Sequence, residues 1–298
     1  MAFVVTSLPD YVNENKNELI TKAVFGAKTA SLINVQTGVK YKDAINILST
    51  DPVLQERTCS FDASGNVTFT QDYIEVGAYK VNMSLCEEDL RKKWMNDQIK
   101  TAAGAENLPF EQKITSEIVD NIDRQVEQKL WVADTTDGDL FNGILTILKD
   151  ASSGAIVVDA SAATSVYDKV LEVYKAIPND VIDKAEIFMG VDDFRTYCID
   201  ITRMDLHHYV ADYNPGSMEL IIPGTNVRLH GVSGLTGTHA IVAANPEYLI
   251  MGTDMQSDME TFDLWYSKDN QEFRLAVKFN LGAAVAFKDL AAYYAPAE

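Results

Sequence analysis

The chain has 298 residues, of which 47% are hydrophobic and 23% charged, so it can bury a large core in one or two domains. Its formal net charge of −19 argues against general affinity for nucleic acid. Three widely spaced cysteines without a C-x-x-C motif indicate reduced thiols. No apolar run is long enough for a signal peptide or a membrane span, so we expect a protein made in a cytosol, without membrane contact.

The first 54 residues are expected to form an N-terminal arm and a lead-in to a hairpin. Pro9 is expected to break any early helix, and a short helix is predicted from Tyr11 to Phe25, ended by Gly26. Because residues 1–38 cannot make a core of their own, we expect this segment to lie on another surface.

Residues 55–84 are predicted to form a long hairpin. Thr58 to Asp62 and Val67 to Thr70 alternate in polarity, and Ser64-Gly65-Asn66 is expected to supply the turn. The preceding run Lys40 to Leu48 predicts a separate short strand. A hairpin with so few apolar residues is not stable alone, so we expect it to need a neighbour.

The stretch from Leu108 to Trp131 predicts a long helix, because Pro109 suits its first position and its interior holds no Gly or Pro. Its apolar residues recur every four positions, so the stripe winds partway round the helix and is expected to meet different partners along its length. Its acids are expected to form a solvated or inter-subunit face: Glu111, Glu117, Asp120, Asp123 and Glu127. A shorter helix, Leu85 to Lys100, is predicted before it, with Ser84 as its N-cap.

Residues 155–250 alternate short strands with helices, which predicts a compact mixed α/β unit. One helix is expected from Ser165 to Ile177, and another is expected to begin with Asp192 as its cap. Two long strands with alternating apolar residues are expected within residues 258–294.

Three patterns resemble chemical sites, and each is disfavoured. Asp134 to Asp139 departs from the calcium-loop spacing, so a solvated turn is favoured. The adjacent His207-His208 pair is expected to be surface or interface polarity rather than a metal site. Ser233 does not lie in a G-x-S-x-G motif, so a hydrolase triad with His230 or His239 is disfavoured. We therefore expect no catalytic residue, no cofactor and no metal.

The order of these parts resembles the major capsid protein of tailed bacteriophages, a fold shared with encapsulin shells and the herpesvirus capsid floor. The closing run DMETFDLWYSKDNQEFRLAVKFNLGAAVAF is similar to the paired strands that end these proteins. The resemblance implies an α+β fold with these parts: an N-terminal arm and lead-in (1–54), an extended hairpin loop (55–84), a peripheral domain (85–154 and 246–298) containing a spine helix (109–131), and an axial domain (155–245).

The resemblance also implies a structural protein rather than an enzyme. Such proteins assemble into hexamers and pentamers that form an icosahedral head around double-stranded DNA. The implied partners are copies of the chain itself, a portal, a scaffold or decoration protein, and DNA packaged without sequence specificity. The implied location is the virion, assembled in the cytoplasm of a host bacterium.

Contacts between subunits are expected on three parts of the chain. The arm lysines are expected to face DNA or to pair with acids of an adjacent spine helix. The residues concerned are Phe61, Asn66 and Phe69 on the hairpin, Lys16, Lys22 and Lys28 on the arm, and Glu117 and Asp120 on the spine helix.

Two alternatives remain. An encapsulin-like compartment would enclose cargo proteins instead of DNA. A soluble α/β enzyme would require a pocket with convergent titratable groups, which the sequence does not indicate.

Overall fold

The computed structural model describes residues 7–55, 64–86, 88–89, 92, 110–160, 163–206, 218–254 and 261–296. These residues form two six-stranded sheets. The first sheet holds β1 (Asn34–Thr37), β2 (Lys42–Pro52), β3 (Gly65–Cys86), β9 (Leu249–Thr253), β10 (Thr261–Ser267) and β11 (Glu272–Val285). The second holds β4 (Ile156–Val157), β5 (Glu186–Gly190), β6 (Glu219–Ile221), β7 (Arg228–Val232), β8 (Ile241–Ala244) and β12 (Ala292–Tyr294).

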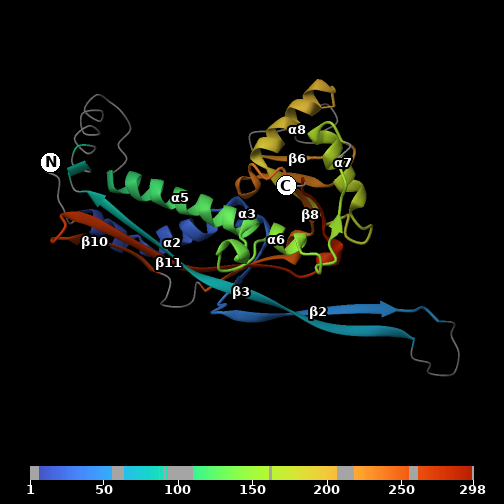
Figure 1. The fold of residues 1–298 in the computed structure, drawn as a ribbon, viewed down its shortest axis with the longest axis horizontal. Helices are drawn as coiled ribbons and strands as arrows, with labels where there is room; N and C mark the ends of the chain where they lie inside the picture. The colour runs from blue at the N-terminus through green and yellow to red at the C-terminus, as the bar shows by residue number, and fades with distance from the viewer. Residues whose placement is uncertain are drawn as a thin grey trace.

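Helices cover both sheets (Figure 1). They are α1 (Ser7–Glu14), α2 (Lys16–Phe25), α3 (Lys28–Leu32), α5 (Phe110–Val132), α6 (Ile144–Lys149), α7 (Val166–Ala176) and α8 (Val191–Arg203), with the short 3₁₀ turns η1 (Thr135–Asp137), η4 (Ser233–Leu235), η5 (Pro246–Tyr248) and η6 (Lys288–Leu290). Within this described part of the chain, no helix is long and apolar enough to cross a membrane.

The long helix α5 confirms the predicted spine helix. It runs along the long strands of the first sheet (Figure 1), and its predicted apolar positions Ile118, Ile122 and Leu130 are at most 6% exposed. Val126 of the same stripe is buried as well, and so is Val119, which lies outside the stripe. The buried face is therefore broader than a single winding stripe, because α5 contacts the sheet on one side and the arm on another.

As expected, the arm lies on another surface, which is the part of its own chain formed by α5 and β10. Leu8 and Val12 of α1 and Leu19, Ala23 and Val24 of α2 are buried in the core that includes α5 and β10. Amphipathic helices of this kind bury their apolar side on whatever surface is adjacent.

The prediction of a single helix from Tyr11 to Phe25 is wrong, because α1 and α2 are separate helices that meet at Asn15. Pro9 does not break α1, since it lies in the first turn, where a backbone N–H has no helical acceptor. The predicted end of the second helix at Gly26 is confirmed.

The hairpin differs from its predicted boundaries. Its first strand is β2, which includes most of the run Lys40 to Leu48 that the sequence predicts as a separate strand, and β2 pairs with residues 65–75 of β3. The predicted turn at Ser64-Gly65-Asn66 is wrong, because Gly65 pairs with Pro52 and Asn66 with Asp51. Residues 58–62, the predicted first strand, lie outside the described residues, which resume at 64.

The strand β3 is also longer than expected and runs to Cys86. Ser84 therefore belongs to a strand and does not cap a helix, which corrects the predicted start of the short helix at Leu85. Residues 88, 89 and 92 are helical. The rest of the predicted helix lies outside the described residues.

The second sheet confirms a mixed α/β unit, with α7 and α8 packed on it through residues such as Val170, Val173, Phe194 and Tyr197. Ser165 caps α7 and accepts the Asp168 N–H. Asp192 is not the cap of α8, which is Gly190. The last strand, β12, also joins this sheet, although the resemblance groups residues 246–298 with the spine helix.

Candidate functional site

The most prominent feature of the molecule is a projecting two-stranded ribbon. β2 and the first half of β3 run out beyond the rest of the fold (Figure 1). Residues 65–75 of β3 pair with β2, whereas β11 pairs with residues 76–86. A ribbon of two strands is marginally stable by itself, so this segment depends on contacts at its base or with another molecule.

One face of the ribbon carries most of its exposed apolar side chains, with the hydrogen-bonded pair Asn46 and Gln71 between them. Directly opposite residues of an antiparallel pair lie on the same side, and sides alternate along each strand. Leu48 pairs with Phe69, and Thr50 and Ala44 pair with Val67 and Tyr73, so these positions share one side. The side chains of Leu48, Val67, Phe69 and Tyr73 are exposed, Phe69 by 78%. We call these four residues the apolar hairpin face.

The opposite side of the ribbon is mostly polar towards its far end, although the half-buried Ile47 lies there opposite Thr70. Thr68 and Thr70 lie there and are exposed, together with Asn66, whose Nδ2 is 3.3 Å from Thr68 Oγ1. Nearer the body this side contributes Ile74, which is buried. Asn66 and Phe69, both predicted to contact a neighbour, therefore lie on opposite sides, and Phe61 lies outside the described residues.

The three arm lysines have partners within the chain. Lys16 pairs with Asp263 of β10 at 2.6 Å, and Lys22 pairs with Glu18 one turn away on α2, also at 2.6 Å. The Nζ of Lys28 donates to the Met218 carbonyl at 2.7 Å, and partial burial lowers its pKa from the usual 10.5. Among the described residues, neither Lys16 nor Lys22 pairs with an acid of the chain's own spine helix.

Glu127 of α5 joins three parts of the fold. Its carboxylate accepts hydrogen bonds from Thr29 Oγ1 of the arm at 3.2 Å and from the Ser233 N–H of η4 at 3.0 Å. The Lys28 N–H also donates to it at 3.2 Å, and Trp131 Nε1 donates to Thr29 at 2.8 Å. This set, which we call the Glu127 junction, ties the arm and the second sheet to the spine helix.

Glu127 is only 4% exposed, so the expectation that it belongs to a solvated acidic face is wrong. The signal was its position one turn after Asp123 and beside Val126, on the side of the helix that helical periodicity directs inward. Glu117 and Asp120 are exposed, as that expectation required.

The histidines do not meet Ser233. His230 is fully buried, with Nε2 2.9 Å from Glu186, whereas His239 contacts Asp193 at 3.0 Å. Ser233 is exposed and gives its backbone N–H to Glu127.

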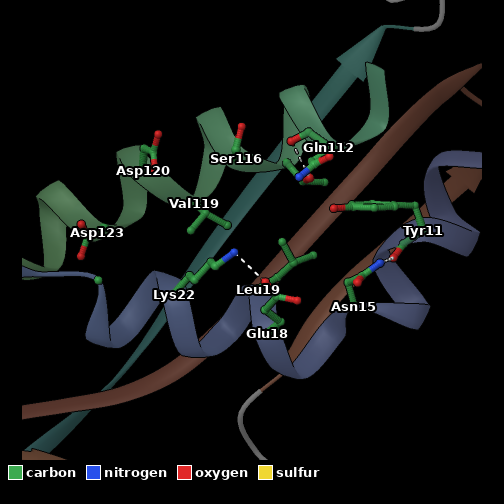
Figure 2. A pocket seen from close by; sticks show the side chains of 12 residues that line it. Tyr11, Asn15, Glu18, Leu19, Lys22, Gln112, Ser116, Val119, Asp120 and Asp123 are labelled. Carbon is green, nitrogen blue, oxygen red and sulfur yellow. Dashed lines mark hydrogen bonds and ion pairs between the residues drawn. The ribbon is translucent and has the colours of Figure 1, made fainter. Parts of the chain in front are cut away.

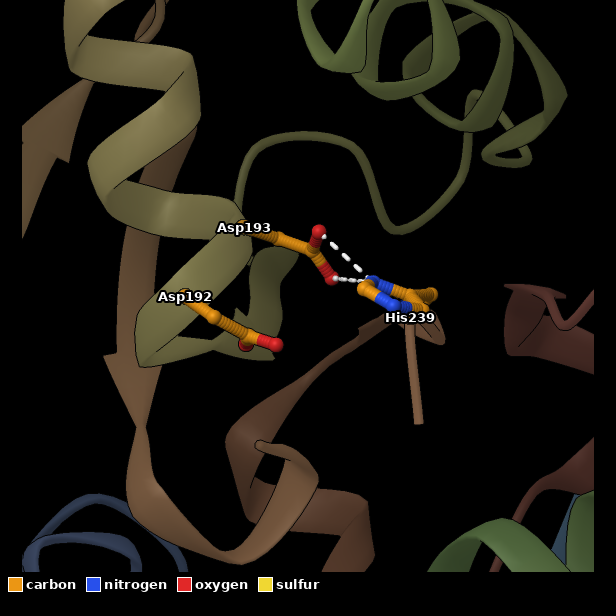
Figure 3. Close-up of side chains that lie close together, drawn as sticks. All are labelled: Asp192, Asp193 and His239. Carbon is orange, nitrogen blue, oxygen red and sulfur yellow. Dashed lines mark hydrogen bonds and ion pairs between the residues drawn. The ribbon is translucent and has the colours of Figure 1, made fainter. Parts of the chain in front are cut away.

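Asp192, Asp193 and His239 place possible metal ligands within 4.8 Å of one another. Figure 3 shows Asp193 and His239 pointing at each other. This hydrogen bond raises the pKa of His239 above its usual 6.5. Asp192 instead accepts the Gly237 N–H. Hydrogen bonds within the chain therefore hold Asp193, His239 and one oxygen of Asp192, whereas Asp192 Oδ1 is buried without a partner among the described residues. His207 and His208 lie outside the described residues.

The turn predicted at Asp134 to Asp139 is confirmed. Asp134 accepts the Thr136 N–H at 2.7 Å, which lowers the pKa of its carboxyl. Asp139 accepts the Asp134 N–H at 3.1 Å and pairs with Lys129 at the end of α5.

The fold is similar to that of chains from several solved capsids and particles. Chains of the "Satellite phage P4 procapsid including size determination (Sid) protein" match with a TM-score of 0.62 and 10% identity over 93% of this chain and 89% of that chain. The "Capsid of empty GTA particle" matches with a TM-score of 0.58 and 10% identity, covering 93% and 90%. A virus-like particle from Pyrococcus furiosus matches with a TM-score of 0.55 and 8% identity, covering 96% and 99%.

No protein-family model matches the sequence, and no curated protein matches it. The structural matches extend over nearly the whole chain, so the chain has the α+β fold of tailed-phage major capsid proteins. The fold that the sequence resemblance implied is confirmed.

Proposed function

We propose that this chain is the major capsid protein of a tailed bacteriophage, which assembles into hexamers and pentamers that form an icosahedral head around double-stranded DNA. The observation that carries the proposal is the apolar hairpin face on a ribbon that projects from the body. In a monomer these side chains stay in water, whereas in a shell a neighbouring copy covers them.

The physical gain from this contact is substantial. Fully burying a side chain of the size of Leu48 or Phe69 contributes roughly 1.5–3 kcal/mol. The same contact is repeated by every copy, so an individually modest interface becomes strong in a closed assembly. Because the ribbon projects from the body, this contact can lie far from the chain's own core, on the body of the next subunit.

A pair of charge substitutions on one strand tests the proposal. Val67→Lys with Phe69→Lys charges the apolar hairpin face and should abolish shells, as seen by negative-stain microscopy and by sedimentation. Thr68→Lys with Thr70→Lys adds the same charge to the same strand on the other side. This control should assemble much better than the first variant. Equal assembly of both variants would refute the role of the face.

The partners we propose are those that a shell requires. They are further copies of the chain in capsomers, a portal, a scaffold or decoration protein, and packaged DNA bound without sequence specificity, in a virion assembled in the host cytoplasm. With a net charge of −19 the wall repels DNA, so the acids should face outward or lie between subunits. A shell protein needs no catalytic activity, so the proposal includes that the chain is a structural protein rather than an enzyme.

A second candidate is a compartment that encloses cargo proteins. The match to the virus-like particle from Pyrococcus furiosus covers 99% of that chain and is compatible with it. Purified shells treated with nuclease decide between the two. Protected DNA supports the phage head, whereas co-purified protein without nucleic acid supports the compartment.

A further inference from the structure

Asp123 lies where α2 of the arm meets the spine helix. It points from α5 towards α2 (Figure 2). A Cβ atom on Gly26, the cap residue at the end of α2, would lie 3.1 Å from the Asp123 Cγ and 3.2 Å from its Oδ1. The carboxyl therefore lies against the C-terminal end of a helix, where the backbone carbonyls concentrate partial negative charge.

One oxygen of the Asp123 carboxyl lacks a hydrogen-bond donor within the described part of the chain. Oδ1 of Asp123 is buried and has no hydrogen-bond partner among the described residues. A buried anionic oxygen without a donor is costly, whereas a protonated carboxyl can itself donate to a carbonyl at the end of α2. Beside it lies a cavity of about 490 Å³ between α1, α2 and α5, so the contact between arm and spine is not fully packed.

The charged groups around Asp123 are mostly acidic. On α5 itself they are Asp120, Glu127 and the single cation Arg124. The other helices add groups around the same cavity or junction: Glu18 and Lys22 of α2, which pair with each other, Tyr11 of α1, and Lys28 of α3, whose N–H donates to Glu127.

We propose that Asp123 is an acid-closed latch, which holds α2 against α5 while its carboxyl is protonated and loosens the arm when it ionises. The latch concerns the single chain and does not depend on shell formation. In an assembly it would make the seating of the arm responsive to the proton concentration of its surroundings.

The direction of the effect is set by the titration of this group. Burial, followed by Glu127 and Asp120, raises the pKa of Asp123 from its usual 3.8 to about 6 in the closed arm. In an opened, solvated arm the pKa returns towards the usual value. The closed arm is then favoured at acidic pH, and this preference is lost as the pH rises through about 6.

Hydrogen exchange of the unassembled full-length chain tests the latch. After correction for intrinsic rates, amides of α2 should be about tenfold better protected near pH 5 than near pH 7.5. The factor is about ten because pH 5 lies about one unit below the pKa of Asp123 in the closed arm. The amides of α7 and α8 provide an internal reference. Asp123→Asn, which cannot ionise, should remove the pH dependence, and Glu117→Gln, at an exposed acid of the same helix, should retain it.

Asp120→Asn gives a second test that leaves the latch in place. Removing this neighbouring charge should move the midpoint of the α2 transition to lower pH. The proposal is overturned if wild-type and Asp123→Asn chains show the same pH dependence in α2, or if Asp120→Asn leaves the midpoint unchanged. Because no shell is needed, failure of the latch is distinct from failure of the proposed capsid function.

Discussion

At the scale of single residues, α5 shows two kinds of burial on one helix. Ile122 is buried among apolar neighbours, where its transfer from water drives packing. Glu127 is buried as a polar group and is tolerated because three donors satisfy its carboxylate. Substitutions at the two kinds of position should therefore fail for different reasons.

Ile122→Asp places an ionisable group without a partner in the core of the spine helix. We expect it to lower the free energy of unfolding by about 3–5 kcal/mol, or to prevent folding. Urea unfolding followed by circular dichroism measures the loss. The matched control is Asn121→Asp, at the exposed neighbouring position, which should change stability little. Normal stability of Ile122→Asp would contradict its placement in the core.

Lys28 and Lys22 should respond differently to charge reversal. Lys28→Glu sets a carboxylate against the Met218 carbonyl and close to Glu127, so we expect a loss of about 2–3 kcal/mol. Lys22→Glu breaks an exposed pair with Glu18, which solvent screens, and should change stability little. Thermal unfolding of both variants at equal ionic strength decides the matter, and equal losses would be evidence against the buried role of Lys28.

At the scale of elements, the contact between η4 and α5 is decisive for how the second sheet sits on the spine helix. Gly234 allows the backbones to approach closely. A Cβ atom there would lie 2.4 Å from the Glu127 carbonyl oxygen and 2.5 Å from Trp131 Cδ1. Neither atom can move without displacing α5 or its largest buried side chain, so this glycine is required for close approach rather than for backbone freedom.

Gly234→Ala should therefore destabilise the chain by about 2–3 kcal/mol through overpacking. Ser233→Ala, one position earlier, keeps the N–H that Glu127 accepts and removes only an exposed hydroxyl, so it should be nearly neutral. Chemical denaturation of both variants measures the difference. A neutral Gly234→Ala would mean that η4 does not press on the spine helix.

At the scale of the whole molecule, the net charge of −19 opposes the association of identical copies. The apolar hairpin face supplies attraction that salt does not screen, whereas salt screens the repulsion between the charges. The balance between these two terms sets the conditions under which shells should form.

Purified chains should accordingly assemble better at about 0.5 M NaCl than at about 0.02 M, because the screening length falls to a few ångströms at high salt. Light scattering and negative-stain microscopy across a salt series measure this. Chains carrying Val67→Lys with Phe69→Lys should stay unassembled at every salt concentration. Better assembly of the wild type at low salt would show that ion pairs between copies, rather than apolar burial, hold the shell.

The sequence by itself determined the elements whose signal is local. The spine helix is specified by its unbroken interior and its apolar spacing, and the paired closing strands are specified by alternation. The order of the parts was enough to indicate the shell fold. It also indicated that Phe69 lies on a hairpin with little core of its own.

Only the tertiary structure decided which elements meet. The first half of β3 pairs with β2. The register of this pair is set by contacts between the two strands, and the local turn pattern Ser64-Gly65-Asn66 does not specify it. The arm seats on its own spine helix because the nearest apolar surface belongs to the same chain. Glu127 is buried, and Asp123 Oδ1 lacks a hydrogen-bond partner among the described residues, at places where segments distant in the sequence pack together. No local sequence pattern specifies such a contact.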